Sequence, residues 1–186
     1  ISQALMYLHS KGYAHRNINP RSILILDYFY FSLSEFKFVE KVSIGDNSDN
    51  NESNQNCETK LLTDTKGSSL FFSPEACSGK PYDGKLNDIW ALGVTFYLAF
   101  FGKLPYGLSE KAPVHAGLIM KAITENPLEF PPFFIQIPNQ SMKRSITLLI
   151  TNMLQKDPNK RISLEECIKS SIFDEAKEII SQQTEN

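Results

Sequence analysis

The chain has 186 residues, of which 41% are hydrophobic and 22% are charged, and its formal net charge at pH 7 is −2. This length allows one domain with a sizeable core, and the near balance of charge gives no electrostatic case for binding nucleic acid or an anionic membrane surface. Three scattered cysteines are typical of free thiols in a reducing compartment, which predicts a cytoplasmic protein. Neither a C-x-x-C pair nor a His/Cys cluster suggests a metal site.

The first third of the chain alternates short apolar runs with polar segments. Residues 1–11 have helical spacing, as if the chain began inside a helix of something longer, and residues 23–26 form a short β-type run. A second strand is predicted within 36–44, whereas the aromatic-rich residues 27–35 have no clear assignment. Residues 46–60 hold five asparagines and hardly any apolar side chain, which predicts a mobile surface loop.

The rest of the chain is predicted to be mostly helical, with prolines between the helices. The most apolar run is Ile89–Phe101, which is too short to span a bilayer and indicates a buried core helix. Few strands followed by many helices, without βαβ alternation, predict an α+β fold that is mainly α. The predicted helices cover residues 85–101, 113–124, 141–155, 163–170 and 173–182.

Residues 7–25 read YLHSKGYAHRNINPRSILI, which resembles the catalytic loop of protein kinases, Y-L-H…H-R-D-[IL]-K-P-x-N-[IL]-L. Four further segments resemble kinase motifs in the family's order. They are 67–75 (GSSLFFSPE, like G-T-x-x-[FY]-x-A-P-E), 88–94 (DIWALGV, like D-[VI]-W-[SA]-x-G-[VC]), 102–106 (GKLPY, like G-x-x-P-F) and 154–161 (LQKDPNKR, like L-x-x-D-P-x-x-R).

The resemblance implies the large, C-terminal lobe of a Ser/Thr protein kinase over residues 1–175, with an activation-loop-like segment at about 40–75 and a polar tail at 176–186. In the lengths and sequences of these motifs, the chain is also similar to the calcium/calmodulin-dependent protein kinase kinases. The motifs of the small lobe, G-x-G-x-x-G and V-A-I-K, do not occur. The resemblance therefore implies a missing small lobe as one partner, a protein substrate or regulatory protein as another, and ATP and Mg²⁺ as cofactors.

Three positions of the catalytic loop depart from the family pattern. Asn17 stands where the family has the Asp that accepts the substrate's proton, and Asn19 stands where it has a Lys that neutralises the γ-phosphate. A neutral amide cannot take that proton, so a general-base contribution of about 10²–10⁴-fold would be lost. Ser22 replaces the Asn that holds the second Mg²⁺, and its shorter hydroxyl would have to reach the ion.

The Asp of D-F-G has two possible equivalents. One register places Glu40-Lys41-Val42 there and has the better spacing and strand, whereas the other places Asp46-Asn47-Ser48 there and keeps the Asp. Both lack the Phe and the Gly. Either carboxylate leaves weak binding of nucleotide or Mg²⁺ open.

Five further positions match the family's scaffold residues. The resemblance implies that His15 packs into the core, that Arg16 contacts a phosphorylated activation loop, and that Asp88 hydrogen-bonds the catalytic-loop backbone. It also implies a buried ion pair between Glu75 and Arg161, in which removal of one partner typically costs about 3–5 kcal/mol. The loop phosphosite itself is open; the candidates are Thr59, Thr63 and Thr65.

Preserved scaffold residues beside replaced catalytic residues predict an inactive or very weak enzyme, a pseudokinase that acts by binding or scaffolding. One alternative is an ATP-dependent Ser/Thr kinase that is active when joined to its small lobe. The other is a truncated gene product without a function of its own.

Overall fold

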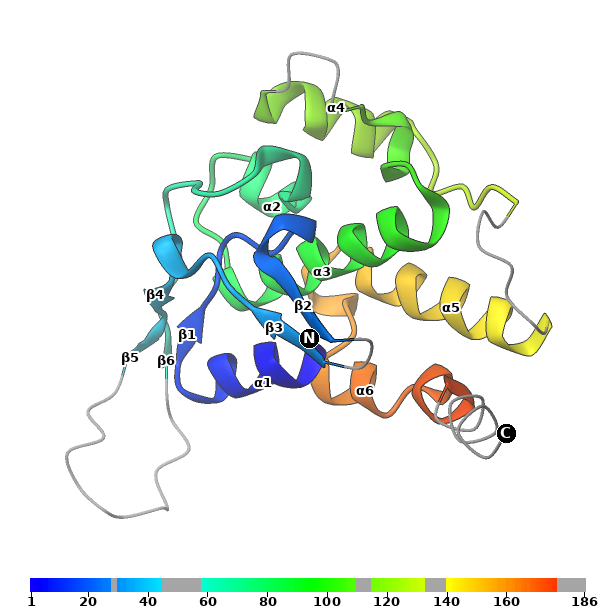
Figure 1. The fold of residues 1–186 in the computed structure, drawn as a ribbon. Coiled ribbons are helices and arrows are strands. Elements are labelled where there is room, and N and C mark those ends of the chain that lie inside the picture. Colours follow the sequence, from blue (N-terminus) through cyan, green and yellow to red (C-terminus); the bar gives the residue numbers. More distant parts are fainter. Residues whose placement is uncertain (28–29, 45–57, 110–114, 133–139, 177–186) are drawn as a thin grey trace.

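The computed structural model describes residues 1–27, 30–44, 58–109, 115–132 and 140–176 (Figure 1). Helices dominate this part of the chain, which confirms the predicted α+β, mainly α fold. The helices are α1 (Ser2–Ser10), α2 (Pro74–Cys77), α3 (Gly84–Phe101), α4 (Ala116–Glu125), α5 (Gln140–Met153) and α6 (Leu164–Ile168), with a further helical stretch at 171–176.

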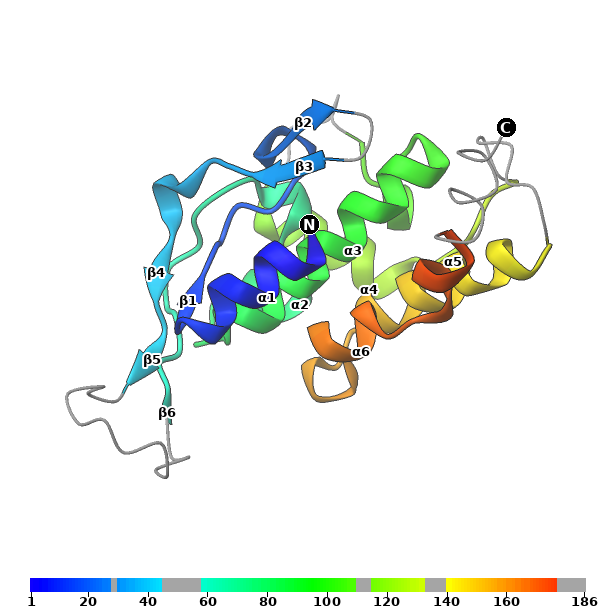
Figure 2. The same cartoon turned by 60° about the horizontal axis from the view of Figure 1, so that its bottom comes forward.

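Helix α3 runs through the middle of the molecule, with α1 and α5 beside it (Figures 1 and 2). Asp83 caps its N-terminus by accepting from the backbone N–H of Lys85 at 2.8 Å, and Gly102 ends it in the left-handed conformation. A β-carbon on Gly93 would lie 2.8 Å from the Cβ of Met153, so this glycine lets α3 and α5 approach closely. Among the described residues, no helix has the length and apolarity that crossing a bilayer requires.

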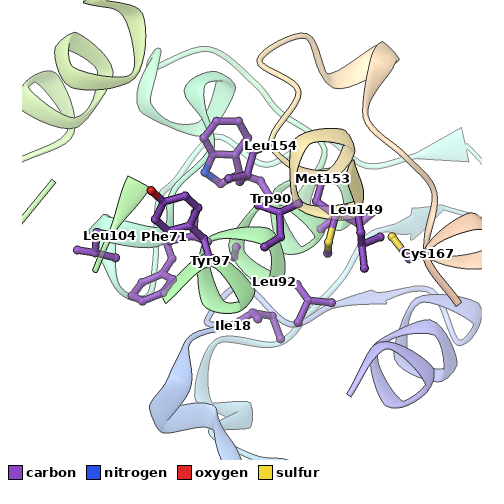
Figure 3. Packing of buried hydrophobic residues seen from close by; sticks show 14 of the residues in the cluster. Ile18, Phe71, Trp90, Leu92, Tyr97, Leu104, Leu149, Met153, Leu154 and Cys167 are labelled. Atoms are coloured by element: carbon purple, nitrogen blue, oxygen red, sulfur yellow. The ribbon is translucent and has the colours of Figure 1, made fainter. Parts of the chain in front are cut away.

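The main hydrophobic core surrounds α3. Figure 3 shows side chains of α3 meeting side chains from α5 and from the segments that follow it. The central indole of Trp90 is 1% exposed and stacks on Tyr106 with ring centroids 6.0 Å apart. The expectation of a buried core helix at 89–101 is therefore confirmed. The residues labelled in the figure are Ile18, Phe71, Trp90, Leu92, Tyr97, Leu104, Leu149, Met153, Leu154 and Cys167.

Within the described residues, the strands form three short antiparallel ribbons. They pair β1 (Tyr13–Ala14) with β4 (Glu40–Lys41), β2 (Ile23–Asp27) with β3 (Tyr30–Leu33), and β5 (Ser43–Ile44) with β6 (Glu58–Thr59). The predicted strand within 36–44 is corrected: residues 36–38 form a 3₁₀ turn, and only two short strands follow. Glu35 has a left-handed φ of 63° and begins this 3₁₀ turn, so extended pairing starts only at Glu40. The unassigned residues 27–35 instead supply β3.

The helix predictions agree with the structure in position more than in length. Helices α3, α4 and α5 lie where they were predicted. Helix α6 begins where expected, with Ser163 as its N-cap in a capping box, but it is shorter than predicted because it already ends at Ile168, with Lys169 as its C-cap. The last predicted helix, at 173–182, corresponds to the stretch at 171–176 and otherwise lies outside the described residues. Of the predicted loop 46–60, residues 46–57 lie outside them and residues 58–59 form a strand.

Candidate functional site

Asp88 is the buried anchor of the loop that follows β1. Its side chain is fully buried in α3 and accepts from the backbone N–H groups of His15 at 2.7 Å and Arg16 at 2.8 Å. His9 of α1 places its Nε2 2.9 Å from the same carboxylate. These contacts hold Arg16 in a left-handed conformation with φ of 67°, which is uncommon for a residue other than glycine. The structure thus brings Asp88 to the loop backbone, where the resemblance places it.

Asn17 lies at the centre of an amide network. Its Oδ1 accepts from the backbone N–H of Ser68 at 3.2 Å and from Nδ2 of Asn19 at 3.1 Å, while its Nδ2 donates to Glu35 at 3.4 Å. A flipped amide would set Nδ2 against two N–H donors and its oxygen against a carboxylate, so the network requires this orientation. The atom that Asn17 directs toward Glu35 is therefore a hydrogen-bond donor, whereas a general base needs an acceptor there.

Asn19 and Ser22 bond each other. The hydroxyl of Ser22 is fully buried, accepts from the Asn19 N–H at 3.1 Å and donates to the Asn19 carbonyl at 2.8 Å, which closes a capping box around the turn Pro20–Ser22. The Asn19 side chain accepts from the backbone of Arg21. Both side chains thus stabilise the loop, and the hydroxyl of Ser22 already donates one hydrogen bond and accepts another.

The turn after β3 returns the chain to this network. Nε2 of His15 lies 2.8 Å from the carbonyl of Ser34, and its ring meets Phe36 edge-on with centroids 5.3 Å apart. Burial lowers the pKa of His15, although Asp88 opposes the shift, so the imidazole is neutral near pH 7. Glu35 is exposed, and its carboxylate faces Asn17. The sequence reading did not single out Glu35.

Of the two carboxylates considered for the D-F-G position, only Glu40 lies within the described residues. It sits on β4 and bonds the guanidinium of Arg16 and, at 2.7 Å, the Nζ of Lys60. This places Glu40 beside the segment that follows β6, whereas the carboxylate that approaches Asn17 belongs to Glu35. Asp46 lies outside the described residues.

The donor set does not fit a two-metal site. Groups of three or more His, Cys, Asp or Glu side chains that could hold a metal ion do not occur in the described part of the chain. Glu35 offers one carboxylate, the hydroxyl of Ser22 is already bonded, and the Asn17 side chain presents an N–H. Hard cations such as Mg²⁺ need oxygen ligands, and among the described residues around Asn17 only Glu35 offers a carboxylate.

Arg161 and Glu75 form the predicted pair in full. Nη1 and Nη2 of Arg161 bond the two oxygens of Glu75 at 2.6 and 3.0 Å, and neither side chain is more than 16% exposed. The remaining donors of the guanidinium bond the carbonyls of Leu86 and Gln155. The plane also lies over the ring of Trp90, with its central carbon 5.2 Å from the centroid. This pair fastens α2 to the C-terminal helices.

The acidic partners of Arg16 predict a dependence of stability on pH. The pKa of Glu40 is lowered first by its hydrogen bond to Lys60 and then by Arg16, and the pKa of Asp64 is lowered first by Lys66 and then by Arg16. Lowered pKa values mean that the unfolded chain binds more protons, so this stabilisation is present at neutral pH. It is lost as pH falls through the lowered values, below the ordinary carboxyl range of about 4.

We expect the urea midpoint of the protein to fall more steeply between pH 5 and pH 3 than that of the double variant Glu40→Gln/Asp64→Asn. The urea midpoint at each pH is measured from the tryptophan emission of the buried Trp90. Identical slopes for the two proteins would contradict the ion-pair assignment.

The two cysteines within the described residues, Cys77 and Cys167, show no sign of reactivity. Burial raises the pKa of Cys77 to about 11 and that of Cys167 to about 12, so both remain thiols at neutral pH. Cys57 lies outside the described residues.

Three features together define the large lobe of a protein kinase. The lobe is mostly helical, the buried Asp88 holds the backbone of the H-R-N loop, and the pair of Glu75 and Arg161 ties α2 to the C-terminal helices. The family model for the protein kinase domain matches residues 1–173, so the chain belongs to the protein kinase family.

Several curated kinases are similar over most of this chain. Serine/threonine-protein kinase TOS3 of Saccharomyces cerevisiae is 33% identical over 88% of the chain and 29% of its own length. Maternal embryonic leucine zipper kinase of Xenopus tropicalis is 31% identical over 88% and 21%. SNF1-activating kinase 1 of Saccharomyces cerevisiae is 31% identical over 86% and 15%. The chain thus spans less than a third of the length of these relatives.

Proposed function

We propose that this chain is the large lobe of a Ser/Thr pseudokinase, which acts by binding a protein partner and transfers phosphate weakly or not at all. The observation that carries the proposal is the orientation of Asn17. Its oxygen is occupied by Ser68 and Asn19, and its N–H points to Glu35. The group that should accept the substrate's proton is thus a donor fixed by three neighbours.

The turn after β3 supports an assignment that the sequence reading did not make. Glu35-Phe36-Lys37 follows the β2–β3 ribbon directly, its carboxylate approaches Asn17, and its Phe packs on His15. We assign these three residues to the D-F-G position, in preference to Glu40 or Asp46. Lys37 then stands where the family has the glycine, so the segment loses that pivot.

ATP and Mg²⁺ are the cofactors of the family, and one exposed carboxylate at position 35 is compatible with weak binding of Mg²⁺ and, through that ion, of ATP. Asn19 brings no positive charge to a γ-phosphate, and the replaced ligands argue against tight binding. The same carboxylate is the one observation that favours the second candidate function, an active Ser/Thr kinase in the company of a small lobe.

Two surfaces are candidates for partners. The β2–β3 ribbon exposes an apolar strip in which Ile25 is 73% exposed and Leu26 and Tyr30 are each 68% exposed, and this strip is the place for the small lobe. The helical face around residues 105–140 is the place for a protein substrate or regulator. It contains α4 and borders a cavity of about 340 Å³, lined among others by Tyr106, Gly107 and Asn126. A cytoplasmic location remains a prediction.

A phosphotransfer assay with radiolabelled ATP on the complete protein tests the proposed function. We expect the wild-type protein and Asn17→Ala to be equally silent. The double variant Asn17→Asp/Asn19→Lys should gain about 10²–10⁴-fold, because it restores the base and sets a positive charge beside it. The lysine also offsets the repulsion that a carboxylate at position 17 would meet from Glu35.

Robust transfer by the wild-type protein that disappears in Asn17→Ala would show an active kinase. A silent double variant that still binds ATP would contradict the assignment of the defect to positions 17 and 19. The single variant Asn19→Lys is the matched control, since it adds the charge without the base.

A further inference from the structure

An ion cluster joins the loop after β1 to the segment after β6. The side chain of Arg16 is 1% exposed. Its Nη2 donates to the carbonyl and to Oδ1 of Asp64, at 2.8 and 2.6 Å, and its Nη1 donates to the carboxylate of Glu40. The backbone of Arg16 is held by Asp88. The guanidinium is therefore fixed at its base by the core and at its tip by two carboxylates from different segments.

Each of these carboxylates bonds a lysine with its other oxygen. Lys60 lies 2.7 Å from Oε1 of Glu40, and Lys66 lies 3.0 Å from Oδ2 of Asp64. Both lysines belong to the same stretch of chain as Asp64. This stretch therefore contacts β4 through Lys60 and Glu40, and it contacts Arg16 through Asp64, whose other oxygen bonds Lys66. Charge-assisted bonds of this kind are stronger than neutral ones, and several in a network hold geometry better than an isolated surface pair.

The chain on either side of Asp64 is also anchored. Leu62 is buried and exchanges two backbone hydrogen bonds with Tyr82, at 2.8 and 3.0 Å, and the hydroxyl of Tyr82 donates to the Asp64 carbonyl at 2.9 Å. Gly67 lies so close to the loop that a β-carbon there would be 2.3 Å from the carbonyl of Arg16. Asp64 thus lies between Leu62 and Gly67, which both contact the rest of the lobe closely, and its carboxylate adds a third contact, to Arg16.

We propose that Asp64 is a built-in anion that holds residues 58–68 against Arg16, so that this segment is ordered without phosphorylation. The resemblance gives Arg16 a phosphorylated residue as its partner. A phosphate brings about −1.5 to −2 charge and several acceptors, and here Asp64 and Glu40 together supply two negative charges and the acceptors.

The consequence concerns when this protein can bind a partner. Thr63 and Thr65, two of the candidate phosphosites, flank Asp64 and are exposed. A phosphate on either would find Nη1 and Nη2 of Arg16 already bonded to carboxylates. The segment leads through Ser68 into α2, which packs on α4. The partner-binding face is therefore assembled in the unmodified protein. The consequence for partner binding rests on the proposed function, whereas the order of residues 58–68 needs neither phosphoryl transfer nor a partner and can therefore hold or fail separately.

Trypsin cleavage of the complete protein tests the role of Asp64. The protein is produced in bacteria and shown by intact mass to carry no phosphate. The rate of cleavage after Lys66 then reports how often the segment opens. We expect slow cleavage in the wild-type protein and about tenfold faster cleavage in Asp64→Asn, which corresponds to about 1.4 kcal/mol. Asp64→Glu should recover most of the resistance.

Glu58→Gln is the matched control, since Glu58 is an exposed acid of the same segment, and it should behave as the wild-type protein does. Emission from Trp90 checks that each variant keeps its core. If Asp64→Asn does not fold, hydrogen exchange of the Leu62 and Ser68 amides in the phosphate-free wild-type protein decides instead, with protection expected. The proposal is overturned if Asp64→Asn resists trypsin as well as the wild-type protein, or if the phosphate-free wild-type segment is unprotected.

Discussion

Replacing Arg161 with methionine is expected to lower the free energy of unfolding by about 3–5 kcal/mol. Methionine fills much of the same space, so the loss comes from the polar groups that remain. The guanidinium makes five hydrogen bonds, two to Glu75 and three to the carbonyls of Leu86 and Gln155. Without it, a half-buried carboxylate and two carbonyls lose their cationic partner, and the stacking on Trp90 is lost as well.

Urea denaturation followed by Trp90 emission measures this effect, and Arg144→Met on α5 is the matched control because Arg144 is exposed. The double variant Glu75→Gln/Arg161→Met should lose less than the sum of the two single variants, since removal of both charges leaves no uncompensated ion. A loss below about 1 kcal/mol in Arg161→Met would be typical of an exposed pair, and would contradict a buried ion pair between Arg161 and Glu75.

Arg161 also illustrates what the sequence could predict. Five ordered motifs indicated the lobe, and the central helix, the partner of Glu75 and the residue beneath the loop followed from their positions in those motifs. The fold class was predictable because 3.6-residue periodicity and proline punctuation are local signals. What periodicity cannot supply is pairing between distant strands, and β3 was missed for that reason.

The missed strand explains the missed carboxylate. Residues 27–35 look irregular alone, and only the antiparallel register with β2, in which Ile23 faces Leu33, shows them to be a strand. That register sets Glu35 immediately after the ribbon. The sequence signal for the proposed D-F-G position was Leu33-Ser34-Glu35-Phe36, which keeps a Phe where D-F-G has one. In the assignment proposed for residues 35–37, a Glu replaces the Asp of D-F-G and a Lys replaces the Gly, and these two changes obscure the motif. The alternation within 36–44 instead favours a strand further downstream.

The ion cluster around Arg16 was beyond the reach of sequence reasoning for a different cause. Asp64 lies in a polar stretch where acidic residues are common, and its motif context points only to a loop. Its role depends on a guanidinium 48 residues away and on the bridge between Leu62 and Tyr82. Such contacts are set by tertiary structure, so a polar loop residue can be assigned only after the chain is folded.

Replacing Asp88 with asparagine is expected to lower the free energy of unfolding by about 3 kcal/mol, although the side chain keeps its shape. Oδ1 accepts from Arg16, and Oδ2 accepts from His15 and faces Nε2 of His9. An asparagine can satisfy one side only. In either orientation its NH₂ group meets a buried backbone N–H, which leaves a donor without an acceptor, and the negative charge is lost.

Thermal unfolding gives the clearest comparison, with a midpoint about 6–12 °C lower expected for a chain of this length. Asp83→Asn is the matched control: it makes the same substitution on the same helix, but at the N-cap, where asparagine serves as well as aspartate. Loss of the Asp88 carboxylate should also loosen the loop after β1. The amides of His15 and Arg16 should therefore exchange faster in Asp88→Asn and not in Asp83→Asn. Equal midpoints for the two variants would mean that Asp88 only fills space, and that the loop keeps its left-handed turn at Arg16 by other contacts.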